Sequence, residues 1–85
     1  MNKNEIKLHV KEIITKCLEL TEISVDDDDN IIDELSINSI DAIGIFLMVE
    51  DEFHIQIDDD DLGVELISSI NNLSSYIEKK KSGDN

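Results

Sequence analysis

The chain is short, acidic and poor in residues that interrupt helices. It has 85 residues with three Gly, no Pro and a formal net charge of −14, which suits one domain with one modest core. The negative charge argues against nucleic acid and anionic membrane surfaces, because phosphate groups would be repelled, and it favours basic protein partners. No apolar run approaches the ~20 residues of a membrane span, and the polar N-terminus lacks the apolar segment of a signal peptide. We therefore expect a cytoplasmic monomer.

Hydrophobic periodicity predicts three main helices. In chain order the expected elements are a helix at 4–20, a long connection at 21–38, a helix at 39–53, a short helical turn around 58–62, a helix at 69–80 and a disordered tail at 82–85. Asn4, Asn38 (or Ser36) and Ser68 are candidate N-caps for the three main helices. The expected fold is thus all-α, a single domain over residues 1–85 and a four-helix bundle whose third helix is very short.

The predicted core is aliphatic. Its expected members are Ile6, Val10, Ile13, Ile45, Val49, Phe53, Ile57, Leu62, Ile70, Leu73 and Ile77. Cys17 lies on the apolar side of the first helix and has no partner for an internal disulfide, so we expect it to be a small packing residue. His9 and His54 are far apart in sequence and lack obvious metal partners, and surface positions are expected for both.

The helix at 39–53 carries two apolar stripes, whereas a helix with a single buried face needs only one. One stripe consists of Ala42, Ile45, Phe46, Val49 and Phe53, and the other consists of Ile40, Ile43 and Leu47. At roughly 100° per residue the two stripes lie about 135° apart on the helix. One stripe can face the core, so the second must be buried by something else or be available to a partner. Ser39 stands at the start of this helix, and Glu50, Asp51 and His54 lie at the edge of the second stripe.

Metal binding and catalysis find little support. The acidic runs at 26–29 and 58–61 fail the spacing of a calcium loop, because hydrophobic residues fall where ligands or Gly are required. Neither His is paired with a nucleophile, and no Gly-rich phosphate loop is present. The chain is therefore predicted not to be an enzyme and to have no metal site. Ser39 alone would be interpreted as a helix cap, but a phosphate ester there would lie near free backbone N–H groups and the positive end of the helix dipole.

The segment around Ser39 resembles the prosthetic-group site of acyl carrier proteins. That family has an aromatic or aliphatic residue, then Asp-Leu-Gly, a variable residue and Asp-Ser-Leu-Asp. Here residues 31–41 are Ile-Ile-Asp-Glu-Leu-Ser-Ile-Asn-Ser-Ile-Asp. The resemblance continues through Glu50-Asp51-Glu52-Phe53 and Ile57, and it covers essentially the whole domain in length, charge and helix order.

The resemblance implies a carrier that is not itself a catalyst. Ser39 would carry 4′-phosphopantetheine, transferred from coenzyme A by a phosphopantetheinyl transferase. The thiol of that arm would hold acyl intermediates as thioesters and present them to enzymes of fatty-acid, lipid or polyketide-type biosynthesis. Those acyl-transferring and chain-modifying enzymes would dock through basic surfaces. The docking residues implied by the family are Asn38, Ile40, Asp41, Ile43, Leu47, Glu50 and Asp51.

Two departures from the family pattern indicate a specialised member. Asn38 replaces the Asp before the serine, and Gly44 occupies a position that commonly carries an acid. Both changes remove negative charge close to the modification site or the docking face. Two alternatives to the acyl carrier stay open. One is a peptidyl carrier, and the other is an unmodified acidic helical module in which Ser39 only caps a helix and the Ile40/Ile43/Leu47 stripe binds a partner.

Overall fold

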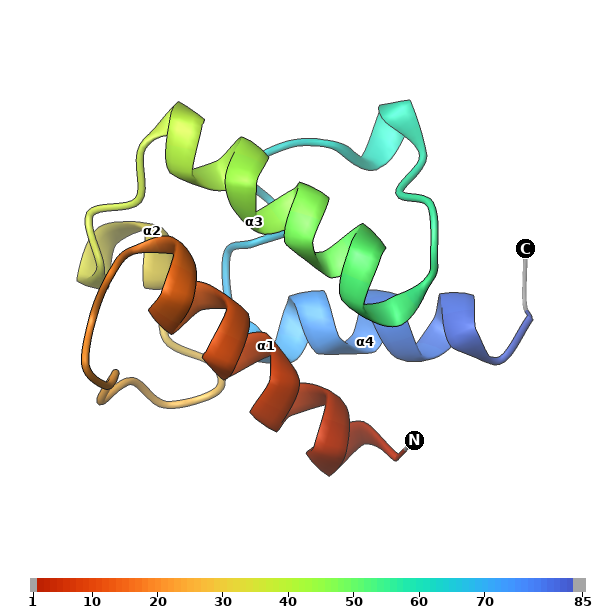
Figure 1. The fold of residues 1–85 in the computed structure, drawn as a ribbon, viewed down its shortest axis with the longest axis horizontal. Helices are drawn as coiled ribbons and strands as arrows, with labels where there is room; N and C mark the ends of the chain where they lie inside the picture. The colour runs from red at the N-terminus through yellow and green to blue at the C-terminus, as the bar shows by residue number, and fades with distance from the viewer. Residues whose placement is uncertain (1, 84–85) are drawn as a thin grey trace.

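A computed structural model describes residues 2–83, and these residues form an all-helical domain without strands (Figure 1). Its elements are α1 (Lys3–Cys17), α2 (Ile31–Glu34), α3 (Ser39–Phe53), the 3₁₀ turn η1 (Asp59–Asp61) and α4 (Ile70–Lys81). The predicted all-α architecture with three long helices is confirmed. The structure adds α2, a single helical turn inside the long connection that the sequence did not resolve. Residues 82 and 83 form a turn, and the rest of the predicted tail lies outside the described residues.

The other two long helices, α3 and α4, both pack against α1. Figure 1 shows α1 and α3 side by side and running in opposite directions, with α4 below α3. α1 contacts both α4 and α3. The long connection at 21–38 leads away from the end of α1 and returns through α2 to the start of α3, whereas the segment between α3 and α4 arches over the other side through η1.

The helix starts are set by side-chain caps. Asn2, not the predicted Asn4, caps α1, and it forms a reciprocal pair of hydrogen bonds with Glu5. Ser69, one residue after the predicted Ser68, caps α4 by accepting a hydrogen bond from the Asn72 N–H at 3.0 Å. Both errors are shifts of one or two residues, because several neighbouring polar side chains can serve as a cap and the helix packing selects one of them.

The buried core is larger than predicted. Ten of the eleven expected residues are buried, and the additional members are Ile14, Ile31, Ile37, Phe46, Leu66 and Ile67. Leu62 was predicted wrongly, since 44% of its surface is exposed. The reason is that the chain passes from Ile57 to Leu66 along the surface, and Leu66 and Ile67 occupy the buried positions instead.

The long connection is fastened to α1 and α4 at Asp27. Its carboxylate pairs with Lys7 at 2.9 Å and with Lys11 at 3.4 Å, and its carbonyl accepts a hydrogen bond from the Asn71 N–H at 2.8 Å. Ile31 then donates its N–H to the Ser68 carbonyl at 3.0 Å. These contacts bring α2 and the start of α3 against the body of the domain, which confirms the expectation that the connection packs onto the core.

We expect Ser74→Ala to stabilise the protein by about 1 kcal/mol. Ser74 lies on α4, is fully buried, and its hydroxyl has no hydrogen-bond partner within residues 2–83. A buried hydroxyl without a partner retains its desolvation cost, and Ala is the better helix former. Urea unfolding measures the change. Ser75→Ala is the matched control, since Ser75 is only partly buried. If Ser74→Ala raises the free energy of unfolding no more than Ser75→Ala does, the prediction is wrong.

The contribution of Asp27 should depend on pH. The Lys7 ammonium holds the pKa of the Asp27 carboxyl below its usual range, so the stabilisation is complete above about pH 4 and is lost as the pH falls through the lower folded-state pKa. Asp27→Asn should therefore cost less than about 1 kcal/mol at neutral pH, because the pair is screened by solvent, and nothing at strongly acidic pH. The comparison is made by urea unfolding across pH, with Asp26→Asn as control. If the difference in free energy of unfolding between wild type and Asp27→Asn does not change with pH, this account is wrong.

Candidate functional site

Ser39 is exposed and is the first residue of α3. The predicted N-cap Asn38 is confirmed, because its side chain accepts a hydrogen bond from the Asp41 N–H at 2.8 Å and its own N–H donates to the Asp41 carboxylate at 3.3 Å. This capping box fixes the backbone without using the Ser39 side chain. Within residues 2–83 the Ser39 hydroxyl makes no hydrogen bond, and the N–H groups of Ser39 and Ile40 have no acceptor. The hydroxyl is thus accessible, and it lies at the positive end of the α3 dipole.

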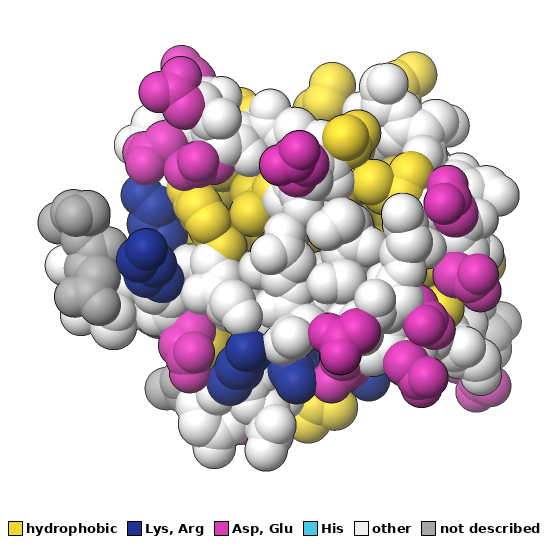
Figure 2. Space-filling view, turned by 180° about the vertical axis from the view of Figure 1, so that it is seen from behind, with side chains coloured by type: hydrophobic (Ala, Val, Ile, Leu, Met, Phe, Trp, Pro, Cys, Tyr) yellow, Lys and Arg dark blue, Asp and Glu magenta, His cyan; other side chains and the backbone are white. Residues whose placement is uncertain are grey.

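The second stripe of α3 is open to solvent. Ile40 is 80% exposed, Ile43 59% and Leu47 60%. The first stripe is buried or nearly so, with Ile45, Phe46, Val49 and Phe53 in the core and Ala42 partly buried. The division of the two stripes between core and surface is confirmed. Figure 2 shows exposed hydrophobic side chains among acidic ones on the rear face of the molecule, with lysines gathered in two separate places.

The three predicted docking acids have different roles in the structure. Asp41 is part of the capping box. Glu50 accepts a hydrogen bond from the Ile57 N–H at 2.8 Å and is only partly exposed, so it holds the chain that follows α3. Asp51 is exposed, and its carboxylate makes no hydrogen bond or ion pair with the described residues. Sequence spacing could place all three on α3, but it could not show that two of them already stabilise the fold.

Ser39 lies at the edge of two hollows in the surface. The larger, of about 510 Å³, is an apolar groove between α3 and the chain from Gln56 to Val64. Its α3 side consists of Ser39, Ala42, Ile43, Phe46, Leu47 and Glu50. The smaller, of about 230 Å³, lies toward α2 and is lined by Ile32, Ile37 and Ile67 among others. Sequence reasoning missed the groove, because its second wall, with the exposed side chains of Leu62 and Val64, comes from a segment without periodic pattern.

Gly44 and Cys17 bring the end of α1 close to the start of α3. A Cβ atom at residue 44 would lie 2.9 Å from the Cys17 sulfur, so Gly permits the close contact. The Cys17 thiol donates a weak hydrogen bond to the Asp41 carbonyl at 3.5 Å, and burial, with Asp41 nearby, raises the pKa of the thiol. Cys17 is therefore a protonated packing residue. Gly44 faces α1, so the sequence argument that it removes a charge from the docking face is wrong.

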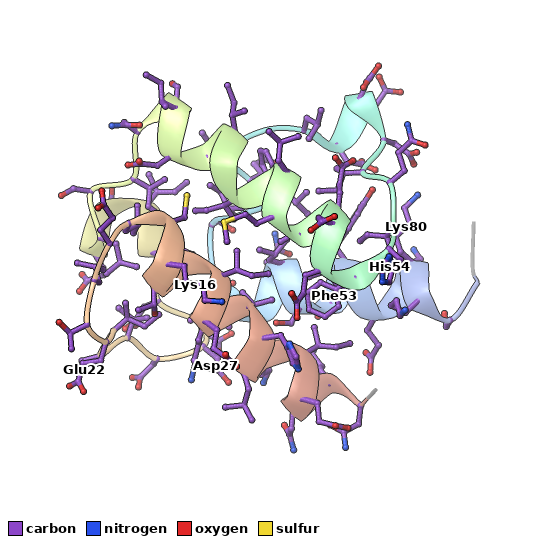
Figure 3. All side chains as sticks on the ribbon, in the orientation of Figure 1. Lys16, Glu22, Asp27, Phe53, His54 and Lys80 are labelled. Carbon is purple, nitrogen blue, oxygen red and sulfur yellow. The ribbon has the colours of Figure 1, made fainter. Side chains whose placement is uncertain are left out.

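The remaining chemistry-bearing residues do not form a second site. His9 pairs with Glu52 at 2.9 Å and its ring meets the edge of Phe53. His54 is exposed and ends α3 in a left-handed conformation; Figure 3 shows it beside Phe53 at that end of the helix. The described part of the chain holds no group of His, Cys, Asp and Glu side chains suited to a metal ion. Among residues 2–83, no helix has the length and hydrophobicity needed to cross a membrane.

Comparison with known proteins identifies the family. The family described as "phosphopantetheine attachment site" matches residues 9–77. An acyl carrier protein of Thermotoga maritima is 38% identical over 79 residues, which cover 93% of this chain and 95% of the relative. The chain belongs to the acyl carrier protein family. Acyl carrier proteins of Solidesulfovibrio magneticus (35% identical, 85% of this chain and 90% of the relative) and Chloroherpeton thalassium (32%, 95% and 99%) are also similar.

Membership of the acyl carrier family decides two of the sequence predictions. The cofactor is 4′-phosphopantetheine, and the protein is a carrier and not a catalyst. The residues at the start of α3 suit this group. Ser39 offers an accessible hydroxyl for a phosphodiester, the N–H groups of Ser39 and Ile40 are free to meet its negative charge, and an apolar groove begins beside them.

Substituting Gly44 should reveal the contact between α1 and α3. We expect Gly44→Ala to lower the free energy of unfolding by up to about 2 kcal/mol, because crowding against the Cys17 sulfur outweighs the gain of about 1 kcal/mol in helix propensity. The double variant Gly44→Ala/Cys17→Ala removes the crowding and should be more stable than Gly44→Ala alone. Urea unfolding of the four proteins of this cycle measures the coupling. Additive effects of the two substitutions would rule out the contact as the cause.

Proposed function

We propose that Ser39 carries the 4′-phosphopantetheine of this acyl carrier protein. The single observation that supports this choice is the accessible Ser39 hydroxyl, which the Asn38–Asp41 capping box leaves without a structural task. A separate phosphopantetheinyl transferase would let this oxygen, as it loses its proton, attack the pantetheine-bearing phosphorus of coenzyme A. The new phosphodiester bond replaces the pyrophosphate P–O bond, and adenosine 3′,5′-bisphosphate leaves. When bound, the arm supplies a thiol that holds an acyl group as a thioester.

We propose that partner enzymes dock on the α3 surface next to Ser39. Ile40, Ile43 and Leu47 supply exposed apolar contacts, and Asp51 supplies a negative charge that no described residue neutralises. Asn38, Asp41 and Glu50 border the same surface but hold the fold at the same time. A net charge of −14 favours partners with basic surfaces, and the association should weaken as salt rises.

We propose that the protein serves a biosynthetic pathway that builds acyl chains. Fatty-acid, lipid or polyketide-type biosynthesis would each use an acyl carrier of this kind, and a cytoplasmic location and a monomeric state are predictions of the sequence. Gly44 faces α1, so Asn38 is the one of the two departures that removes a charge beside Ser39 and supports a specialised carrier. The unmodified interaction module is the competing function, and loading of Ser39 separates the two.

Incubation of the protein with coenzyme A, Mg²⁺ and a broad-specificity transferase should add the mass of one phosphopantetheine. Ser39→Ala should abolish the gain, whereas Ser36→Ala, which changes an exposed serine just before α3, should retain it. Intact-protein mass spectrometry makes the measurement. If the wild-type chain gains no mass with any transferase tried, the interaction module becomes the better function. A gain that persists in Ser39→Ala would move the attachment site elsewhere.

A further inference from the structure

Asn38 caps α3 with a neutral side chain immediately before Ser39. Its amide oxygen accepts a hydrogen bond from the Asp41 N–H at 2.8 Å, and its backbone N–H donates to the Asp41 carboxylate at 3.3 Å. The NH₂ group of the same amide has no acceptor within residues 2–83. A carboxylate caps a helix about as well as an amide does. Capping alone therefore does not distinguish a neutral side chain at this position from a charged one.

Few charged groups surround the Ser39 hydroxyl. Asp41 is the charged side chain of the first turn of α3, and it makes no ion pair with the described residues. The N–H groups of Ser39 and Ile40 have no acceptor in the same part of the chain, and they belong to the positive end of the α3 dipole. A phosphate ester on the Ser39 oxygen would therefore find two open donors and one carboxylate in this turn.

The charge of residue 38 changes this balance. A carboxylate at residue 38 would place a second negative charge beside the phosphate, and it would compete with the phosphate for the positive end of the helix dipole. The Asn38 amide adds no charge, and its NH₂ group is open to an acceptor. A neutral cap thus secures the start of α3 without repelling an anion on the next residue.

We propose that Asn38 is a positioning residue for a phosphate ester on Ser39, and that its neutral cap leaves the N–H groups of Ser39 and Ile40 as partners for the phosphate. Attachment then stabilises the chain, because the phosphate charge meets the positive end of α3. A carboxylate in place of the Asn38 amide weakens this stabilisation. The inference rests on the proposed attachment of phosphopantetheine at Ser39.

The test compares the full chain before and after attachment of unacylated phosphopantetheine. Wild type, Asn38→Asp and Asn4→Asp are measured in both forms. Asn4→Asp is the matched control, since it makes the same change from amide to carboxylate on an exposed residue in the first turn of α1. Figure 1 shows the starts of α1 and α3 at opposite ends of the molecule. Only the change in Tm on loading is compared, so the effect of each substitution on the unloaded chain cancels.

At low salt we expect loading to raise Tm equally in wild type and Asn4→Asp, and by about 2–4 °C less in Asn38→Asp. The difference should vanish in about 1 M NaCl, where the Debye length is ~3 Å. The carboxyl that Asn38→Asp introduces should bind its proton about threefold more tightly after loading, because the phosphate is a second negative charge.

NMR spectroscopy reports the contact itself. The amide proton signals of Ser39 and Ile40 should move downfield on loading in wild type and Asn4→Asp, and less so in Asn38→Asp. A cap with a structural role alone would leave these responses the same in all three proteins. Equal rises in Tm for the three proteins would overturn the proposal, and so would a difference that persists in 1 M NaCl or amide signals that do not respond to loading.

A phosphate installed without a transferase separates this proposal from the assignment of the prosthetic group. Phosphoserine is incorporated at residue 39 during synthesis of the chain, and it carries about −1.5 to −2 charges at pH 7. Its effect on Tm should again be less favourable in Asn38→Asp than in wild type or Asn4→Asp. If no transferase loads Ser39 but phosphoserine distinguishes the variants, the role of Asn38 stands and the attachment site falls. If Ser39 is loaded and neither phosphate distinguishes them, the attachment site stands and the role of Asn38 falls.

Discussion

Burial of one stripe of α3 is the interaction on which the rest of the structure depends. Ile45, Val49 and Phe53 are almost completely enclosed by the other helices, and each large apolar side chain contributes roughly 1.5–3 kcal/mol when buried. A helix anchored in this way cannot rotate without exposing that stripe. Ile40, Ile43 and Leu47 are consequently held on the outside, with Ser39 one residue before them. The position of the functional surface follows from the packing of the opposite side of the same helix.

Polar contacts fix the two ends of α3, which the hydrophobic core does not determine. The Asn38–Asp41 capping box ends the preceding loop and starts α3 at Ser39. Glu50 secures the chain that leaves α3 at the other end of the groove. Asp41 and Glu50 thus accept hydrogen bonds from backbone N–H groups of the protein itself. These carboxylates keep their negative charge, but their positions are fixed by the fold.

Buried side chains anchor both long connections of the domain. The connection between α1 and α3 has buried side chains, Ile31 and Ile37, in addition to the contacts of Asp27, so the start of α3 rests on a firm base. The connection between α3 and α4 has the buried side chains of Ile57, Leu66 and Ile67, and its exposed residues 58–65 are held by polar contacts from α4.

The sequence by itself determined the local features of this protein. The bounds of α3, its cap Asn38 and its two stripes depend on residues within one or two helical turns of each other, so periodicity and capping chemistry were sufficient. The motif around Ser39 is similarly local. Tertiary structure decided what depends on residues far apart in the chain. Gly44 faces Cys17 on another helix, and Leu62 is exposed because Leu66 and Ile67 take the buried positions. Glu50 meets a backbone N–H only because the chain turns back beyond the end of its helix. No periodic pattern within a helix encodes such contacts, since each depends on how separate parts of the chain pack together.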